Sequence, residues 1–508
     1  MLIIAAIPIL IILILMIGYR WGATRAGAAG YLAALFIAIA FFGAGLDVLA
    51  FAHVKAIILS GDVLFIIWAA FLLYRVAEDA GAIKTIGRLL PALTRDRGMQ
   101  ALLIGWVFAS FLQGAGGFGV PVAVTAPLLI GLGFSPLNAV LIPSIGHGWA
   151  VTFGSLGSSF NALLSATGLD AATLAPLSAL YLGLACLLTG PMVAHAADGW
   201  SGVKRLLIPA LVIGAVMSTV QFAVVVGAGL WNLGAFTGGL AGLAVSLWVA
   251  RCGGAGQGVE RSERKALLLA LTAYIILILF TVVILLIPPV KDWLGQVSIQ
   301  IQFPETVTAL GYVSSAGTNR PIHVFTHAGA ILVYTSLLSF FIYQRAGLYG
   351  AGAGKDILRG TIKSMIPSSL SIILMVSMSS LMQSSGMTEA LAQGLAKAVG
   401  KAFPLIAPWI GGIGAFITGS NTNSNVVFAG LQMRTAELLT YSIPAILAGQ
   451  TAGAAVTSVA APAKVVVGAS TAGMTGKEGD VLRALVGYIA LLVIFIGLLT
   501  GLACLLEL

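Results

Sequence analysis

The sequence T-G-S-N-T-N-S-N at residues 418 to 425 contains six consecutive polar residues between the apolar flanks 413 to 417 and 426 to 428. Unpaired amides and hydroxyls in hydrocarbon cost on the order of several kcal/mol each. Inside a membrane such a run needs a cavity, an ion or a polar ligand, whereas in water it would be an ordinary loop. The rest of the chain decides between these two interpretations.

The composition indicates a membrane protein. Of the 508 residues, 59% are hydrophobic and 8% are charged, and the mean hydropathy is +1.05, whereas a soluble domain carries roughly a quarter charged residues. Because one span takes about 20 apolar residues, we expect an all-α polytopic membrane protein with about 12 to 14 membrane segments. A lipid bilayer is then its surroundings. The net charge of +9 indicates membrane topology and not binding to nucleic acid.

Ten apolar runs are expected to be membrane helices. The first is followed by Tyr19, Arg20 and Trp21 instead of a small-residue cleavage site, which favours a retained helix over a signal peptide. The three cysteines are scattered singly and predict neither a disulfide framework nor a zinc site. The ten runs are 2–18, 28–50, 56–76, 174–196, 205–226, 229–250, 266–288, 322–343, 362–383 and 482–505.

Two regions, 98–165 and 404–470, are long enough to enter the membrane but are interrupted by Gly, Pro, Ser, Thr and Asn. Irregular backbone at membrane depth occurs where protein or a water-filled cavity surrounds it. The first interruption is Q-G-A-G-G-F-G-V-P at 113 to 121, whose glycines would each cost about 1 kcal/mol in a helix interior. We expect a re-entrant hairpin there, with free N–H groups suited to a carboxylate. Close helix packing through small residues is the alternative.

An internal repeat relates the two regions. A shift of 305 positions places Gly148 to Thr152 (G-W-A-V-T) on Gly453 to Thr457 (G-A-A-V-T), and the two interruptions on each other. The predicted organisation follows from this shift. It consists of an N-terminal transmembrane helix at 1–24, a first repeat at 25–197, intervening helices with an external connection at 198–321, and a second repeat at 322–508.

The placement of basic residues predicts that the repeats are inverted. The stretch 75–97 is rich in Lys and Arg, whereas its counterpart at 380–402 carries Lys397 and Lys401. The positive-inside rule then places 75–97 in the cytoplasm, both chain ends outside, and the two repeats in opposite orientation. Inverted repeats with discontinuous helices are typical of secondary transporters that bind substrate near the membrane midplane. The basic residues of the first stretch are Arg75, Lys84, Arg88, Arg95 and Arg97.

The candidate site residues come from the two interruptions and from the polar breaks about thirty residues after each. Lys464 could pair with an anionic substrate or extend to the interface, and His147 could carry a proton or be structural. Oxygens of Ser420, Asn421 and Thr422 could hold Na⁺. The predicted substrate-binding set is Gln113, Gly114, Gly116, Gly117, Gly119, His147, Thr152, Ser155, Ser420, Asn421, Thr422, Asn423, Ser424, Asn425, Gln450, Thr457, Ser458 and Lys464.

Other chemistry is disfavoured. His323 and His327 have i, i+4 spacing without an acidic neighbour in sequence, which favours interfacial residues over a metal pair. No nucleotide-binding or hydrolase motif occurs in the chain. We therefore expect no enzyme activity, no cofactor and no resident metal.

The interrupted regions resemble the L-lactate permease family in Q-G-A-G-G-F-G-V-P-V-A-V-T-A-P-L-L-I-G-L-G-F at 113–134, T-G-S-N-T-N-S-N-V-V-F at 418–428, V-T-S at 456–458 and G-K-E at 476–478. That family consists of bacterial and archaeal inner-membrane symporters that take up lactate and glycolate with protons. The Ser420 to Thr422 tip is also similar to those of the divalent-anion carboxylate symporters, which implies inverted repeats and elevator-type motion.

Departures from the family pattern fall at the centre of the predicted site. The resemblance implies a Glu at Gln113 and an Asp at Asn421, and it implies a Gly-Lys pair where Ser458 and Val459 stand. An amide does not titrate near neutral pH. Coupling to H⁺, coupling to Na⁺ and uncoupled diffusion therefore all stay open.

The sequence thus predicts a symporter for a small 2-hydroxymonocarboxylate such as L-lactate or glycolate, with an elevator-type alternating-access mechanism. Its partners would be the small organic anion, a coupling cation (H⁺ or Na⁺) and the bilayer, and a homodimer is one assembly left open. The alternatives are a Na⁺-coupled transporter of another carboxylate or a sulfonate, and an anion channel.

Overall fold

The computed structural model describes residues 1–19, 21–89, 94, 96–117, 119–252, 261–319 and 321–507, without the side chains of 89, 247, 250–252 and 261–264. Arg20, Arg95 and Phe118, which entered the sequence predictions, lie outside this part. Within it, ten helices are long and apolar enough to cross a membrane. The prediction of an all-α polytopic membrane protein is confirmed.

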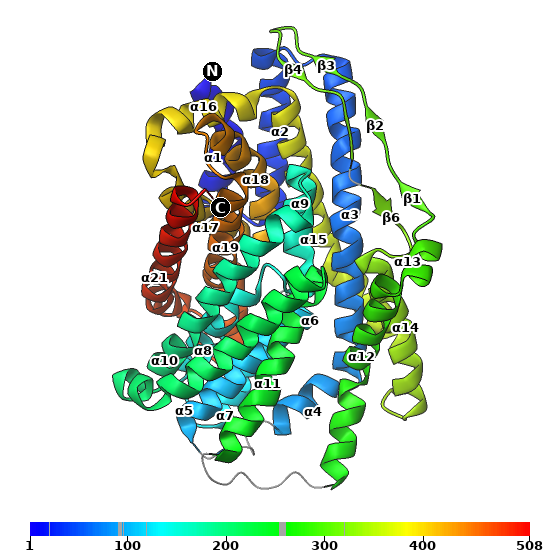
Figure 1. Ribbon diagram of the computed structural model, residues 1–508, viewed down its shortest axis with the longest axis vertical. Helices are drawn as coiled ribbons and strands as arrows, with labels where there is room; N and C mark the ends of the chain where they lie inside the picture. The colour runs from blue at the N-terminus through cyan, green and yellow to red at the C-terminus, as the bar shows by residue number, and fades with distance from the viewer. Residues whose placement is uncertain are drawn as a thin grey trace.

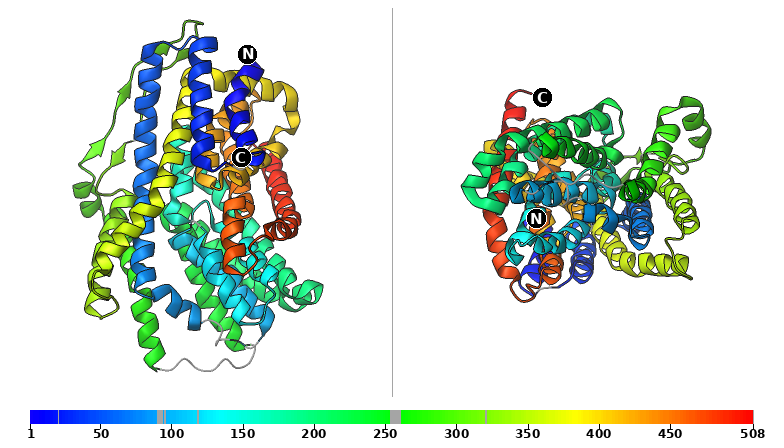
Figure 2. Two further views of the ribbon diagram at one scale, coloured as in Figure 1. Left: turned by 180° about the vertical axis from the view of Figure 1, so that it is seen from behind. Right: turned by 90° about the horizontal axis from the view of Figure 1, so that it is seen from below.

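Long helices form one side of the molecule, which we call the wall. Helix α15 packs along both α2 and α3, and α14 packs along α3 (Figure 1). The hairpin of α1 (Leu2–Ile17) and α2 is seen clearly from behind (Figure 2), and α12 (Arg261–Leu286) packs against α14. The wall consists of α2 (Ala23–Phe42), α3 (Leu46–Asp79), α14 (Ala328–Arg345) and α15 (Ala353–Ser384).

Shorter and broken helices pack together into what we call the bundle. Trp106 and Trp149 are among its fully buried side chains. The first half contains α5 (Arg97–Ala101), a π-helix (Leu102–Phe108), α6 (Ala109–Ala115), α7 (Val120–Gly131), α8 (Pro136–His147), α9 (Ser158–Thr167), α10 (Ala171–Phe222) and α11 (Gly234–Cys252). The second half contains α16 (Met387–Val399), α17 (Phe403–Thr418), α18 (Asn421–Leu438), α19 (Ile443–Thr457), α20 (Pro462–Thr471) and α21 (Glu478–Leu505). The connecting helices are α4 (Ala82–Leu89) and α13 (Pro288–Leu294).

Several of the predicted helix runs have different limits in the structure, among them 28–50, 56–76 and 322–343. The run 28–50 is divided by a turn at Gly43, whose φ of +67° suits glycine and whose added Cβ would lie 2.9 Å from the Cβ of Ala309. After this turn α3 continues without a break past the predicted gap before residue 56. The predicted run 322–343 begins as a helix at Ala328, because His327 is its N-cap and accepts a hydrogen bond from Gly329 N–H.

A long antiparallel ribbon, not anticipated from the sequence, occupies the connection between α13 and α14. It consists of the strand pairs β1–β6, β2–β5 and β3–β4, and it runs along the outer side of α3 (Figure 1). Its tip is tied down where Ala309 N–H donates to Gly43 O at 2.8 Å. The strands are β1 (Ser298–Ile299), β2 (Gln302–Phe303), β3 (Thr306–Val307), β4 (Val313–Ser314), β5 (Gly317–Thr318) and β6 (Ile322–His323).

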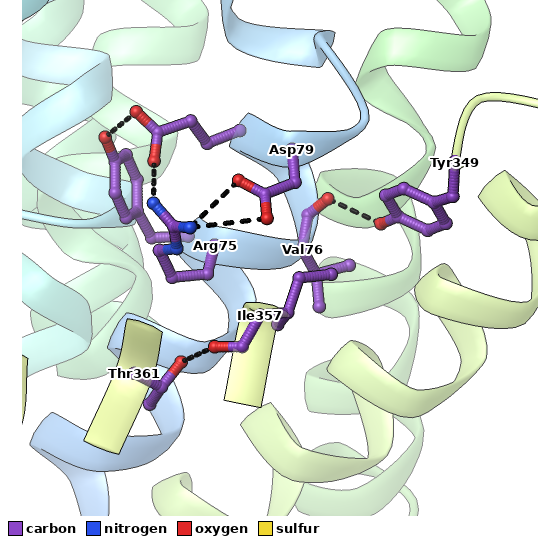
Figure 3. A network of polar contacts seen from close by, with 8 residues as sticks. Arg75, Val76, Asp79, Tyr349, Ile357 and Thr361 are labelled. Atoms are coloured by element: carbon purple, nitrogen blue, oxygen red, sulfur yellow. Dashed lines mark hydrogen bonds and ion pairs between the residues drawn. The ribbon is translucent and has the colours of Figure 1, made fainter. Parts of the chain in front are cut away.

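At the opposite end of α3, a polar network fixes the wall (Figure 3). The Arg75 guanidinium pairs with Glu78 at 3.0 Å and with Asp79 at 3.2 Å. The Tyr349 hydroxyl, in the loop between α14 and α15, donates to Val76 O at 2.6 Å, and burial raises the pKa of this phenol. The Tyr349 hydrogen bond joins α3 to the loop between α14 and α15.

Elements of the two predicted repeats recur at the same spacing. Helices α3 and α15 end 305 positions apart, α2 and α14 begin 305 positions apart, and α9 and α20 begin 304 positions apart. The order of broken and continuous helices is the same in both halves. The opposite orientation of the halves and the domain limits stay predictions.

Candidate functional site

The glycine-rich interruption forms the tip between α6 and α7. Gly117 and Gly119 have φ values of +62° and +85°, in the left-handed region that glycine adopts readily. A Cβ on Gly117 would overlap the hydroxyl of Ser155, whereas one on Gly119 would meet nothing within 4 Å. The tip is therefore pressed against the break between α8 and α9.

The polar run 418–425 forms the turn between α17 and α18 and the first turns of α18. Gly419 supplies the turn with φ +75°, and the Ser420 hydroxyl caps α18 by accepting a hydrogen bond from Asn423 N–H at 3.3 Å. Asn421, Asn423 and Asn425 are 2%, 5% and 0% exposed. The run is thus a buried helix start and not a solvated loop.

The two later polar breaks lie against this helix start. Asn421 Nδ2 donates to Thr152 Oγ1 at 3.0 Å, across the break between α8 and α9. Asn425 Nδ2 donates to Ser159 O and to Thr451 Oγ1, both at 2.9 Å. Thus α18 is bonded to α9, to α19 and to the break before α9 in the interior.

A cavity of about 630 Å³, which we call the substrate cavity, opens between these breaks and the wall. Lys464 is the one charged residue among the described residues that line it. Its ammonium donates to Ser458 Oγ at 3.1 Å, which orients it by a bond to a neutral group and leaves its charge free for an anion. The predicted site residues that line the cavity are Gln113, Gly119, Ser155, Ser420, Asn421, Thr422, Asn423 and Lys464.

The other predicted residues lie behind this lining, and their role in binding stays a prediction. Gly114 packs against the backbone of Phe236, where a Cβ would not fit, as expected for close helix packing. The His147 Nδ1–H donates to Pro143 O at 2.6 Å, away from the cavity lining. The residues outside the lining are Gly114, Gly116, Gly117, His147, Thr152, Ser424, Asn425, Gln450, Thr457 and Ser458.

Several acceptor oxygens around the cavity have no protein partner. Gln113 Oε1, Asn421 Oδ1 and Asn423 Oδ1 are buried and without a hydrogen bond among the described residues, while the amide nitrogens of Asn421 and Asn423 donate to Thr152 and Ser371. A substrate hydroxyl, water or a cation would satisfy such oxygens. No group of three His, Cys, Asp or Glu suited to a metal occurs in the described part.

The wall contributes a serine face that the sequence reasoning missed. Ser364, Ser368 and Ser371 of α15 line the wall side of the cavity, and Ser158 and Ser159 of α9 line it from the bundle. The spacing 364, 368, 371 places three hydroxyls on one side of an apolar helix. This periodicity was present in the sequence but lies far from the interrupted regions.

His327 was expected to be interfacial, but it lies against a buried carboxylate. Its Nε2 is 2.8 Å from Asp62 Oδ1, and the side chains are 9% and 13% exposed. Because His327 Nδ1 accepts from Gly329 N–H, the Nε2 carries the hydrogen and donates to Asp62. The pairing was missed because Asp62 is 265 positions away in the chain.

Comparisons with known proteins agree with the resemblance. The sequence model of the L-lactate permease family matches residues 1–506. The chain is 27% identical over 534 residues to glycolate permease GlcA of Escherichia coli K12, covering 98% of this chain and 94% of the relative. It is 26% identical to an L-lactate permease of Salmonella typhimurium and 27% identical to one of Halalkalibacterium halodurans, each covering 98% of this chain and 95% of the relative.

Proposed function

This chain belongs to the L-lactate permease family, and from this membership we propose that it is a symporter that imports a small 2-hydroxymonocarboxylate such as L-lactate or glycolate. The family consists of multi-pass membrane transporters and not of enzymes. Two relatives are named L-lactate permease and glycolate permease. Lactate and glycolate both have a carboxylate with a hydroxyl on the adjacent carbon.

The substrate cavity supports this choice of cargo. Among its described lining residues there is one cation, Lys464, and no carboxylate, and the remaining polar groups are amides and hydroxyls. One cation balances one carboxylate, while unpaired oxygens such as Asn421 Oδ1 can accept from a hydroxyl. A dicarboxylate would leave one charge unbalanced in a partly desolvated site.

An elevator-type movement of the bundle along the wall is the proposed mechanism. The hairpin tips, the helix breaks and Lys464 belong to the bundle, whereas the wall contributes the serine face of α15. Among the hydrogen bonds of the described residues, Ser165 to Asp62 and Asn423 to Ser371 cross the seam between the two bodies. Where the contacts between two bodies are mostly apolar, few hydrogen bonds have to break when one body slides along the other.

Coupling to a cation completes the proposal. Gln113 and Asn421 stand at the positions where the resemblance implies acids, and amides cannot carry a proton. Their oxygens can coordinate Na⁺ instead, while a proton needs a carrier elsewhere. We therefore propose cation-driven uptake and test H⁺ and Na⁺ in turn.

Purified protein in liposomes tests the function. Labelled L-lactate or glycolate should enter under an imposed pH gradient or Na⁺ gradient, and unlabelled substrate inside should accelerate entry by exchange. Uptake of a sulfonate but of neither hydroxy acid would contradict the cargo. Conductance without accelerated exchange would indicate a channel.

Lys464→Met tests the site. Because hydrogen bonds to charged groups contribute about 1.5–3 kcal/mol, we expect the affinity for the carboxylate to fall roughly ten- to hundredfold. The control is Lys355→Met, which removes an exposed lysine at the start of α15, away from the lining of the cavity. Equal exchange rates in both variants would exclude Lys464 from the site.

A further inference from the structure

A second cavity, of about 270 Å³, lies beneath the ribbon and separate from the substrate cavity. We call it the vestibule. Its lining combines Lys55 and Asp62 of α3, the end of α9, the end of α15 and residues of the ribbon. Orientation by basic residues predicts that the ribbon side faces outside, so the vestibule faces the solution from which substrate is taken up.

The vestibule and the substrate cavity are consecutive parts of one route. Between them lies a narrow space of about 10 Å³, lined in part by Val63, Ala162, Val376 and Val426. Helices α3, α9, α15 and α18 each contribute residues to the vestibule, to this constriction and to the substrate cavity. On α3 the order is Lys55, then Val63, then Ile67. The constriction, lined by six apolar residues and by Ser165, Ser379, Ser380 and Gln383, therefore lies between the two larger polar spaces.

Lys55 is the unexplained charge on this route. It lies in an apolar helix of 34 residues, where an ionisable side chain is expensive and indicates a function. Lys55 is half-buried, and it is the one cation among the described residues that line the vestibule. Its ammonium has no hydrogen bond or ion pair with any of these lining residues. Asp62, by contrast, accepts hydrogen bonds from Ser165 at 2.7 Å and from His327 at 2.8 Å.

The surroundings of Lys55 suit a small carboxylate. Hydroxyl and amide groups of the ribbon can donate to an anion that the ammonium attracts. Asp62 lies seven positions further along α3, about two helical turns toward the constriction, and its charge disfavours deeper entry by an anion. The polar ribbon residues that line the vestibule are Thr306, Ser314, Ser315, Thr318 and Asn319.

From this geometry we propose that the vestibule is an outer anion-binding site, in which Lys55 captures the small carboxylate before the substrate cavity opens to the outside. The proposal rests on the proposed function for its ligand. A positive charge in a recessed, low-dielectric site raises the local concentration of anions and speeds their association. Lys55 would therefore set the apparent affinity on one side of the membrane and leave the turnover of the bundle unchanged.

Transport from each side tests the proposal. In right-side-out vesicles at low salt, Lys55→Met should raise the KM for L-lactate or glycolate by about three- to tenfold with unchanged maximal rate, and Lys55→Arg should restore it. The difference should shrink as salt is added, and in inverted vesicles the KM should not change. The control is Lys291→Met, which removes an exposed lysine of α13 on the ribbon side. An unchanged KM in right-side-out vesicles, or a change seen in inverted vesicles alone, would overturn the proposal.

A labelling experiment separates this site from transport. In a Lys464→Met background, a membrane-impermeant amine reagent added outside should modify Lys55, and L-lactate should slow this reaction whereas neutral lactamide should not. Mass spectrometry of the peptide reports the extent. If L-lactate slows the labelling of Lys55 but the unmodified chain transports neither hydroxy acid, the proposed function is contradicted and the anion site is retained. Normal transport by the unmodified chain, without protection by L-lactate, would contradict the anion site alone.

Discussion

Asn421 and Asn425 lie one helical turn apart in α18 but have different surroundings. Asn421 lines the substrate cavity, and its side chain donates to Thr152, its one side-chain partner among the described residues. Asn425 is fully buried behind the lining and joins Ser159 and Thr451. The sequence gives both the same side chain in the same polar run, so their roles are distinguished by packing.

Alanine at these two positions should therefore give different results. Asn421→Ala is expected to abolish uptake while the midpoint of thermal unfolding stays close to that of the unmodified protein, because a cavity-lining group can be replaced by water. Asn425→Ala should also lower stability, by about 1–3 kcal/mol, since it leaves buried partners unpaired. Uptake and unfolding in detergent measure the two effects. Wild-type uptake in both variants would mean that the polar run has no part in binding.

At the scale of elements, the helix breaks depend on backbone geometry that few residues tolerate. Gly117 adopts φ +62° with no room for a Cβ beside Ser155, and Ser155 itself has φ +45°. The left-handed conformation costs a non-glycine residue roughly 1–2 kcal/mol. The contact between Gly117 and Ser155 thus stabilises the backbone conformation of both the hairpin tip and the break between α8 and α9.

Gly117→Ala and Gly119→Ala isolate this contact. Both residues have positive φ, but a Cβ at Gly119 meets open space, so Gly117→Ala should reduce transport far more than Gly119→Ala. Adding Ser155→Gly to Gly117→Ala removes the obstructing hydroxyl and should recover part of the activity. Equal losses in the two single variants, measured as the rate of exchange in liposomes, would show that the contact with Ser155 is unimportant.

At the scale of the whole molecule, the proposed elevator movement would take place along the seam between the wall and the bundle. Apolar side chains form part of the constriction along it, and Val63 of α3 and Val426 of α18 belong to one buried apolar cluster across it. An apolar contact of this kind disfavours the entry of water and ions. It also contains no hydrogen bonds that would have to break when the two bodies slide.

Cross-linking across the seam tests this movement. In a chain without native cysteines, Val63→Cys with Val426→Cys should stop exchange when joined by a short reducible cross-linker, and reductant should restore it. Ala407→Cys with Ala436→Cys, a pair inside the bundle, should leave exchange unchanged when joined. Full exchange with the seam pair joined would exclude relative movement of the wall and the bundle.

The sequence was sufficient for features that depend on local composition and spacing. Hydropathy predicted the membrane class, and the polar interruptions at 113–121 and 418–425 indicated where polar groups gather around the cavity, because unpaired polar atoms in hydrocarbon need a partner. Lys464 was identified in the same way, as a charge inside an apolar segment. The ribbon, the limits of α2 and α3, and the partner of His327 were not predicted.

By itself, then, the sequence determined the class, the helical architecture and eight residues of the cavity lining, since each follows from the solvation of side chains along a short segment. Tertiary structure alone decided which of those residues face the cavity, that α15 presents its serine face to it, and that Asp62 and His327 meet across 265 positions. The reason is physical. Whether a polar atom is free to bind a ligand depends on whether a distant part of the chain already satisfies its hydrogen bond.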